Sequence, residues 1–268
     1  MKIVCEKEKL LKGINSVING VASKTTMPVL EGILIQTKDK EVKLTSYDLE
    51  IGIEYIIECN VLEEGSTVIN ATMFTEIIRK LPDTEITISI NEKNLLEIEC
   101  EGSLYKLATM DPKEFPELPK INIDNSIEIE QNLLKNMIRK TIFAVSNEEN
   151  RPIFTGCLFE VVDNKLNVVA VDGYRLALKT NILNNNTNSF HAVIPGKTLN
   201  EINKIIVDSF DTIKIGISKN QALFEMENCK IVTRLLDGEF LNYNNAIPAN
   251  WETRIRVNKN NIQNCFER

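Results

Sequence analysis

The stretch VVAVDGYRLALK, residues 168–179, reads as a strand, a tight turn and a second strand, with Asp172 and Gly173 at the bend. Asp-Gly between two apolar runs is a strong short-range hairpin signal, because glycine adopts a positive φ without steric cost. An acid followed by Tyr174 and Arg175 is also typical of a functional corner. Taken alone, the stretch leaves open whether this corner is a site or a bend.

The same corner occurs earlier in the chain. LTSYDLEIGIE (44–54) matches VAVDGYRLALK (169–179), and Asp48 precedes Asp172 by 124 positions. The flanking segments repeat at offsets of 124 or 125: residues 10–36 match 133–160, 68–81 match 193–206, and 83–115 match 211–240. A fixed internal period indicates a repeated structural unit. Since a single active site has little reason to occur twice, the duplication favours an architectural turn.

A third copy begins near the C-terminal end. IRVNKNNIQNCFER (255–268) repeats the apolar spacing of residues 127–140. A strand and a helix alone cannot bury a core. We therefore predict a first domain over residues 1–122, a second over 123–250, and the first strand and helix of an incomplete third domain over 251–268.

Each complete repeat predicts the same order of elements. A short strand leads into an amphipathic helix, in which apolar residues such as Leu10, Ile14 and Val17 share one face. A second helix is expected over Ala71–Leu81, with Asn70 as N-cap, and over Lys197–Val207. Alternating hairpins close the repeats, pairing 86–90 with 95–99 and 213–217 with 222–226. Two helices and about eight antiparallel strands per repeat make an α+β fold rather than a parallel βαβ sheet.

The composition is that of a globular chain with a negative net charge. The 268 residues are 43% hydrophobic and carry a net charge of −7. This balance argues against a surface that binds nucleic acid everywhere, but it permits a local basic patch. The N-terminal residues do not resemble a signal peptide, and no run approaches the roughly 18 apolar residues of a membrane helix. We expect a cytoplasmic protein whose six scattered cysteines are reduced thiols rather than disulfides or metal ligands.

Catalytic signatures are missing from the sequence. It contains no HExxH, Walker A, GxSxG or GxGxxG motif, and its single histidine, His191, fits an ordinary loop or edge-strand position. General acid–base catalysis needs two groups within reach of one substrate, whereas Asp48 and Asp172 belong to different repeats. We expect a binding protein. A hidden enzyme would reveal itself by turnover that is abolished when His191 or one cysteine is changed.

Several motifs together resemble the bacterial DNA polymerase III beta subunit family, the sliding clamps. They are MPVLEGILI (27–35), LTSYDLEIGIE (44–54), MFTEIIRKLP (73–82), RPIFTGCLFE (151–160), AVDGYRLAL (170–178) and TRLLDGEF (233–240), in register along the chain. The resemblance implies the DNA-clamp fold, with helices lining a hole and sheets outside. It implies two three-domain subunits joined head to tail around duplex DNA, as a processivity factor with no catalytic activity and no cofactor. The implied partners are the replicative polymerase, the clamp loader and other peptide-motif proteins of replication and repair.

Candidate DNA contacts lie on the helices and on two loops. Lys12, Arg79, Lys135 and Arg139 lie on helices with an apolar opposite face, and are either a solvated surface or a DNA-facing one. The resemblance adds the positions Lys24, Thr72, Arg151, Pro152, Ile153 and Lys197. A mildly basic lining suits sliding, because each phosphate contact releases counterions and deepens binding. The lining is less basic than the family pattern, since Thr72 and Met73 replace a basic pair and Glu148 and Glu149 would repel phosphate.

The resemblance also gives the opening corner a second role, as part of a shallow apolar groove for short linear motifs. The matching positions are Phe154, Val171, Gly173, Tyr174, Arg175, Leu176, Leu241, Asn245 and Ala246. Apolar walls would hold the anchor side chains, and Gly173 would let the peptide approach closely. Leu241 stands where a proline is usual and Asn245 where a basic residue is usual, so peptide preference can differ.

In the family, a third domain supplies the other wall of this groove and the interface with the partner subunit's first domain. Only residues 255–268 match it here. The sequence is therefore either part of a longer three-domain clamp or a natural short clamp, three copies of which would give six domains. Two functions stay open: a processivity clamp, or a clamp-derived interaction module that closes no ring and only binds partner peptides or full clamp subunits.

Overall fold

The structure is a computed structural model that describes residues 1–148, 150–184 and 188–268. It divides into two compact units, residues 1–238 and 239–268, and each is described by itself. The larger unit contains both complete repeats. The smaller contains η6 (Tyr243–Ala246) and α5 (Lys259–Phe266).

The first repeat has nine strands and two α-helices. Its elements are β1 (Lys2–Glu6), α1 (Lys7–Val17), η1 (Ile18–Gly20), η2 (Pro28–Glu31), β2 (Gly32–Lys38), β3 (Glu41–Tyr47), β4 (Ile51–Glu58), β5 (Asn60–Glu63), β6 (Gly65–Asn70), α2 (Ala71–Lys80), β7 (Glu85–Ile90), β8 (Leu95–Cys100), β9 (Ser103–Met110) and η3 (Pro112–Glu114).

The second repeat follows the same order, with eight strands among its described residues. Its elements are β10 (Asn125–Glu130), α3 (Gln131–Arg139), η4 (Ile142–Ala144), η5 (Pro152–Thr155), β11 (Gly156–Val162), β12 (Lys165–Val171), β13 (Leu176–Ile182), β14 (Phe190–Pro195), α4 (Gly196–Ile205), β15 (Thr212–Ile217), β16 (Gln221–Glu225) and β17 (Cys229–Arg234). The predicted α+β fold is confirmed, and the hairpins β7–β8 and β15–β16 form where alternation predicted them.

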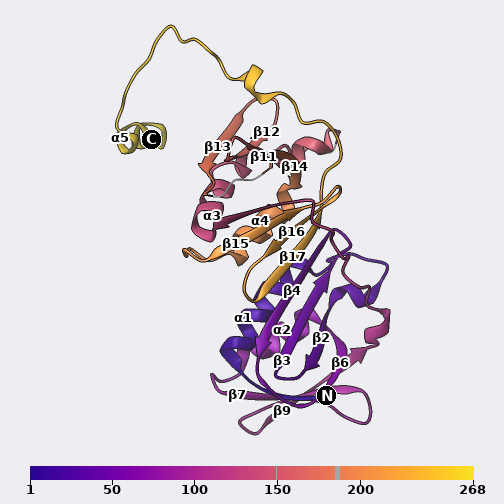
Figure 1. The fold of residues 1–268 in the computed structure, drawn as a ribbon. Helices are drawn as coiled ribbons and strands as arrows, with labels where there is room; N and C mark the ends of the chain where they lie inside the picture. The colour runs from indigo at the N-terminus through magenta and orange to yellow at the C-terminus, as the bar shows by residue number, and fades with distance from the viewer. Residues whose placement is uncertain (149, 185–187) are drawn as a thin grey trace. The chain divides into compact units, whose positions relative to one another are not determined.

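Antiparallel pairing joins the two repeats through one sheet (Figure 1). The larger sheet runs β10-β15-β16-β17-β4-β3-β2-β6-β9-β8-β7-β1-β5, and the smaller runs β13-β12-β11-β14. The joint is the pairing of β17 with β4, in which Ile231 lies opposite Ile53 and Val232 opposite Gly52. We refer to this pairing as the seam. It makes the repeats one continuous body.

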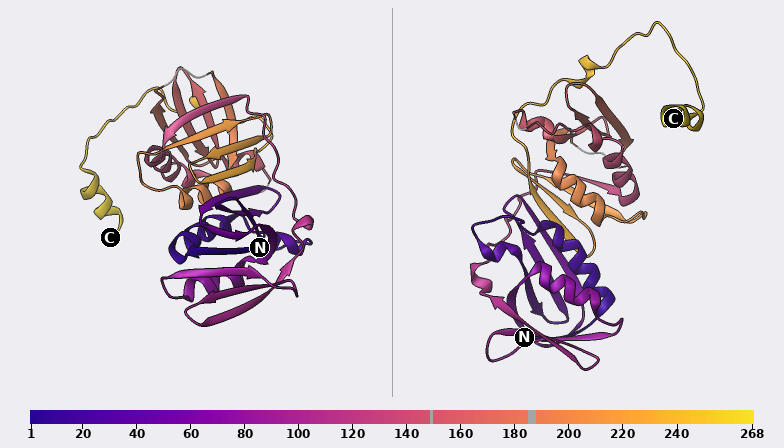
Figure 2. Two further views of the ribbon diagram at one scale, coloured as in Figure 1. Left: turned by 60° about the horizontal axis from the view of Figure 1, so that its bottom comes forward. Right: turned by 180° about the vertical axis from the view of Figure 1, so that it is seen from behind.

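The four α-helices described within residues 1–238 lie on one side of this body, with the sheets behind them (Figure 2, right). Asn70 caps α2 as predicted, since its side chain accepts a hydrogen bond from the N–H of Met73 at 3.1 Å. The helix ends one residue earlier than expected, at Lys80. In the second repeat α4 begins at Gly196, one residue before the predicted start, and ends two residues before the predicted end, at Ile205.

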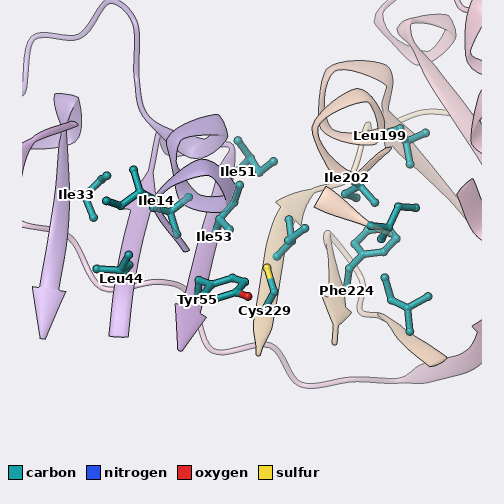
Figure 3. Close-up of a cluster of buried hydrophobic side chains, with 14 of the residues drawn as sticks. Ile14, Ile33, Leu44, Ile51, Ile53, Tyr55, Leu199, Ile202, Phe224 and Cys229 are labelled. Carbon is teal, nitrogen blue, oxygen red and sulfur yellow. The ribbon is translucent and has the colours of Figure 1, made fainter. Parts of the chain in front are cut away.

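One apolar core crosses the seam (Figure 3). Ile14 of α1 and Ile53 of β4 pack on the first-repeat side, while Phe224 of β16 and Ile202 of α4 pack on the second-repeat side. All four side chains are fully buried. Since burial of one such side chain contributes about 1.5–3 kcal/mol, the seam is held by packing as well as by the strand pairing.

The opening corner is a duplicated turn. The side chain of Asp172 accepts hydrogen bonds from the N–H groups of Tyr174 and Arg175, at 3.0 and 3.1 Å. Asp48 accepts from the two equivalent N–H groups of its own turn, at 3.0 and 2.7 Å. The residue after each aspartate has a positive φ, 91° at Gly173 and 74° at Leu49. The turn is therefore architecture in both repeats.

The strand expected at the start of residues 251–268 does not form. The helix does form, as α5, and Asn258 caps it. Residues 251–258 contain no strand, and Ile255 and Val257 are exposed. The equivalent strands β1 and β10 each pair with a neighbour, and a strand without a partner leaves its backbone hydrogen bonds unmade. The three domain boundaries stay predictions.

Candidate nucleic-acid interface and partner groove

The α-helices described within residues 1–238 carry more basic than acidic side chains. Nine lysines and arginines (Lys7, Lys9, Lys12, Arg79, Lys80, Lys135, Arg139, Lys197, Lys204) stand against three glutamates (Glu8, Glu76, Glu201). We call this surface the helix face. One face of each of these helices is buried, while most of the charged side chains lie on the opposite, accessible face. A chain with net charge −7 thus presents a helix face of charge +6.

Lys12, Arg79 and Arg139 have the properties that a phosphate contact needs. All three are exposed. No ion pair in the described part of the chain holds any of them. Arg79 and Arg139 lie in the last turns of α2 and α3, where a cation also complements the helix dipole. Their charge therefore has a structural role even without a ligand.

Lys135 and Lys197 are instead engaged within the protein. Lys135 is half-buried, and its Nζ donates to the carbonyl of Ile206 at 2.7 Å. The Nζ of Lys197 lies 2.9 Å from Oδ2 of Asp48, and this hydrogen bond raises the pKa of Lys197. The pair ties α4 of the second repeat to the corner of the first. Because the partners are 71 and 149 residues away in sequence, no local pattern predicts these contacts.

An open hollow of about 900 Å³ lies between α1 and the end of α4. Lys7, Lys12 and Lys204 line it together with Glu8 and Asp83. Lys204 is already paired with Glu201 at 2.8 Å. The hollow is therefore only mildly basic, which suits loose contact with a polyanion better than tight anion binding.

The loop candidates are also on the surface. Lys24 is exposed, and so is Thr72, which lies on α2 rather than in a loop. Arg151 and Pro152 are exposed at the start of η5, and Ile153 is half-buried. The N–H of Arg151 donates to the carbonyl of Glu148, so the acid lies in the same turn. Glu149, the other predicted repulsive residue, lies outside the described residues.

The second-repeat corner presents one side chain fully to solvent. Tyr174 is 97% exposed, while Val171 before it is buried and Leu176 after it is half-buried. Arg175 is held by Asp172, Nε to Oδ2 at 2.8 Å, and lies 5.8 Å from the ring centre of Phe143. The backbone N–H of Tyr174, with Arg175, lowers the pKa of Asp172. A fixed turn thus carries a projecting aromatic ring.

The remaining groove candidates are divided between the two units. Phe154 is half-buried in η5 of the larger unit. In the smaller unit Leu241 is half-buried, and Asn245 and Ala246 are exposed in η6, which Asn242 caps.

The described residues contain no cluster of three histidine, cysteine or acidic side chains able to hold a metal ion. None of the helices in this described part of the chain has the length and hydropathy of a bilayer span.

Comparison with known proteins supplies the family. Residues 1–119 match the model of the DNA polymerase III beta subunit N-terminal domain, and residues 128–242 match that of its central domain. The beta sliding clamps of Staphylococcus epidermidis and Halalkalibacterium halodurans are 34% and 35% identical to the chain. Both alignments cover 100% of the chain and 73% of the relative.

Solved structures agree with this assignment. A putative DNA polymerase III beta subunit from Eubacterium rectale superposes with a TM-score of 0.95 at 38% identity, covering 100% of this chain and 73% of that one. The sliding clamp of Bacillus subtilis gives 0.89 at 36% identity, covering 93% and 68%. With its duplicated fold, its helix face and these relatives, the chain belongs to the bacterial DNA polymerase III beta subunit family, the beta sliding clamps.

Proposed function

We propose that the chain works as a non-catalytic, cytoplasmic clamp subunit, and that copies of it join head to tail into a ring around duplex DNA. Such a ring would tether the replicative polymerase, the clamp loader and other peptide-motif proteins to the template. The observation that carries the proposal is the charge of +6 on the helix face of a chain whose net charge is −7. A localised positive surface in an acidic body attracts DNA preferentially to that surface.

We assign the DNA contacts mainly to exposed basic side chains that are not already bonded within the protein. Lys12, Arg79 and Arg139 of the helix face would approach phosphates, with Lys24 and Arg151 from the loops. Thr72, Pro152 and Ile153 would add uncharged contacts, while Lys135 and Lys197 would contribute weakly because they are already bonded. Five phosphate contacts give a slope of log K against log salt of about −4.5. DNA would thus be held loosely enough to slide.

Two strand edges support head-to-tail assembly. At the seam, β4 of the first repeat accepts β17 of the second. By the internal repeat, β13 is the counterpart of β4, and β9 is the counterpart of β17. Within the described chain, no strand pairs with the outer side of β13 or with that of residues 103–108 of β9. Complementary edges on one chain generate a ring if the rotation between copies closes.

Retention on circular DNA is the decisive test. The chain is loaded on nicked circular DNA, its mass in solution is measured by light scattering, and the circle is then cut. An oligomer that stays on the circle and leaves the linear form supports a ring. A 30.4 kDa monomer without topological retention would favour the alternative, a module that only binds partner peptides or full clamp subunits.

A variant series then tests the helix face. Lys12→Ala, Arg79→Ala and Arg139→Ala should each lower the salt slope by about 0.9. Lys135→Ala is the matched control, because its amine is bonded to Ile206, and it should change the slope less. Equal effects of all four variants would contradict the assignment of contacts.

The larger unit's part of the partner groove would comprise Phe154, Val171, Gly173, Tyr174, Arg175 and Leu176, while Leu241, Asn245 and Ala246 of the smaller unit remain predicted groove positions. Tyr174 would be its anchor, since an aromatic side chain is a frequent centre of binding energy. Tyr174→Ala should weaken binding of polymerase-derived peptides at least about 30-fold, the equivalent of 2 kcal/mol. Phe210→Ala, at a ring that is 81% exposed elsewhere, is the control and should bind as the parent does.

A further inference from the structure

Two cysteines face each other across the edge of the larger sheet. β1 and β5 are antiparallel, with Ile3 opposite Val61 and Val4 opposite Asn60. Cys59 directly precedes β5, and continuing this register by one residue would place Cys5 opposite it. The Cys5 thiol donates to the carbonyl of Glu6 at 3.5 Å, and the Cys59 thiol is close enough for each cysteine to shift the pKa of the other. Side chains directly opposite in an antiparallel pair have Cβ atoms about 4.5–5.5 Å apart, close to the roughly 3.5–4.5 Å of a disulfide.

The two thiols differ in accessibility and in acidity. Cys59 is half-buried, whereas Cys5 is 4% exposed. The neighbouring Cys5 thiol lowers the pKa of Cys59, and the neighbouring Cys59, together with burial, raises the pKa of Cys5. The accessible sulfur is thus the better nucleophile, since the thiolate is the reactive form. The buried sulfur lies where a second thiol is needed to complete a disulfide.

We infer that Cys5 and Cys59 form an oxidisable dithiol that small hydroperoxides convert to a disulfide. The Cys59 thiolate attacks the O–O bond of the peroxide and becomes a sulfenic acid, while hydroxide or alkoxide leaves and is protonated. The Cys5 sulfur then attacks the sulfenic sulfur, its proton leaves with the sulfenic oxygen as water, and the S–S bond forms. Two thiols are oxidised and one peroxide is reduced.

The other cysteines lack this arrangement. Cys100 lies beside the hydroxyl of Thr84 at 3.4 Å. Burial raises the pKa of Cys157 and of Cys229 to about 12, so neither is a ready nucleophile. Cys265 is exposed on α5 of the smaller unit and faces no second cysteine within that unit. Reaction within the folded chain is therefore selective for Cys5 and Cys59.

The disulfide would fasten β5, the last strand of the larger sheet, to β1. α1 begins one residue after β1 ends, so the link would stiffen the edge that leads into the helix face. It would alter no charge of that face and no residue of the proposed groove. The inference therefore stands or falls independently of the proposed function.

Peptide mapping after oxidation tests it on the full chain, carrying Cys265→Ser to prevent links between molecules. The protein is treated with hydrogen peroxide, free thiols are alkylated with iodoacetamide, and the digest is analysed without reductant. We expect a cross-linked peptide pair containing Cys5 and Cys59, lighter by two hydrogen atoms than the sum of its parts, which dithiothreitol separates. Cys100, Cys157 and Cys229 should become alkylated after unfolding, as in untreated protein.

Two variants separate the roles of the sulfurs. Cys59→Ser should leave Cys5 reduced after the same treatment. Cys5→Ser should leave a sulfenic acid at Cys59 that dimedone traps. Cys229→Ser is the matched control and should give the same cross-linked pair as its parent. Two results with the parent chain would overturn the inference, whether or not the variants fold. In one, both Cys5 and Cys59 remain open to alkylation after oxidation; in the other, either cysteine is linked to a different cysteine.

Discussion

Replacing Asp48 by alanine should destabilise residues 1–238 much more than removing Lys197, its ion-pair partner. One carboxylate oxygen of Asp48 accepts from the N–H groups of Glu50 and Ile51, at 3.0 and 2.7 Å. The other accepts from Lys197 at 2.9 Å. The Asp48 side chain is 10% exposed and that of Lys197 is 64% exposed. The turn, rather than the ion pair, should therefore account for most of the loss.

The magnitude follows from what each variant leaves unpaired. Asp48→Ala leaves the N–H of Ile51 without its acceptor, and because Ile51 is 1% exposed this costs about 1–3 kcal/mol. Glu50 is exposed, so water replaces its bond. A solvent-screened pair such as Asp48–Lys197 contributes about 0.2–1 kcal/mol. We expect a loss of about 2–3 kcal/mol for Asp48→Ala and under about 1 kcal/mol for Lys197→Ala.

Thermal and urea unfolding, followed by circular dichroism, measure the difference. At about 2–4 °C per kcal/mol for a unit of this size, Asp48→Ala should lower Tm by roughly 4–12 °C. Lys197→Ala should lower it by no more than roughly 4 °C. Asp172→Ala is the matched control, because its partners Tyr174 and Arg175 are exposed and water can replace it. Equal losses for Asp48→Ala and Lys197→Ala, or an unchanged midpoint for Asp48→Ala, would refute the reasoning.

Three further outcomes are expected. Gly52→Ala should lower the free energy of unfolding, measured with urea, by about 1–3 kcal/mol, because the added Cβ would collide with Leu118 at the seam. Unchanged stability would contradict this packing. Phe224→Ala should cost about 3–5 kcal/mol, since the ring is fully buried, and a smaller loss would show that the core closes around the cavity. Asp172 should titrate in NMR below the ordinary aspartate pKa. The stabilising contribution of the Asp172 carboxylate should be present above its unfolded-state pKa and be lost as pH falls through its folded-state pKa. Asp172→Asn should remove this pH dependence. An ordinary pKa for Asp172 would argue against the capped turn.

The sequence was sufficient where structure depends on neighbours along the chain. Asn70 as the cap of α2, the hairpins and the Asp-Gly corner follow from hydrogen bonds and φ preferences within a few residues. The internal repeat then extended these local predictions to the fold, because two copies that share a pattern share an architecture. The shifts of one or two residues at helix ends are where local signals are weakest.

Contacts between distant segments could not be predicted in this way. Nothing near Lys197 indicates that its amine meets Asp48, and nothing near Lys135 indicates the carbonyl of Ile206. The facing cysteines became evident only when the register of β1 and β5 was known. Residues 251–258 show the same limit, because they form no strand although their sequence pattern predicts one. A strand forms only when another strand pairs with it, and the sequence pattern does not identify that partner.

The seam also bears on the order in which the chain folds during synthesis. β4 is made early, but its partner β17 lies more than half the chain length further on. Since domains generally fold N-terminal first as they emerge, the first repeat must persist for a time with one side of β4 bare. Glu54 and Glu58 on that strand and Gly52 near its start are residues that discourage pairing with a second nascent chain. The finished first repeat would then be the template on which β17 completes the second.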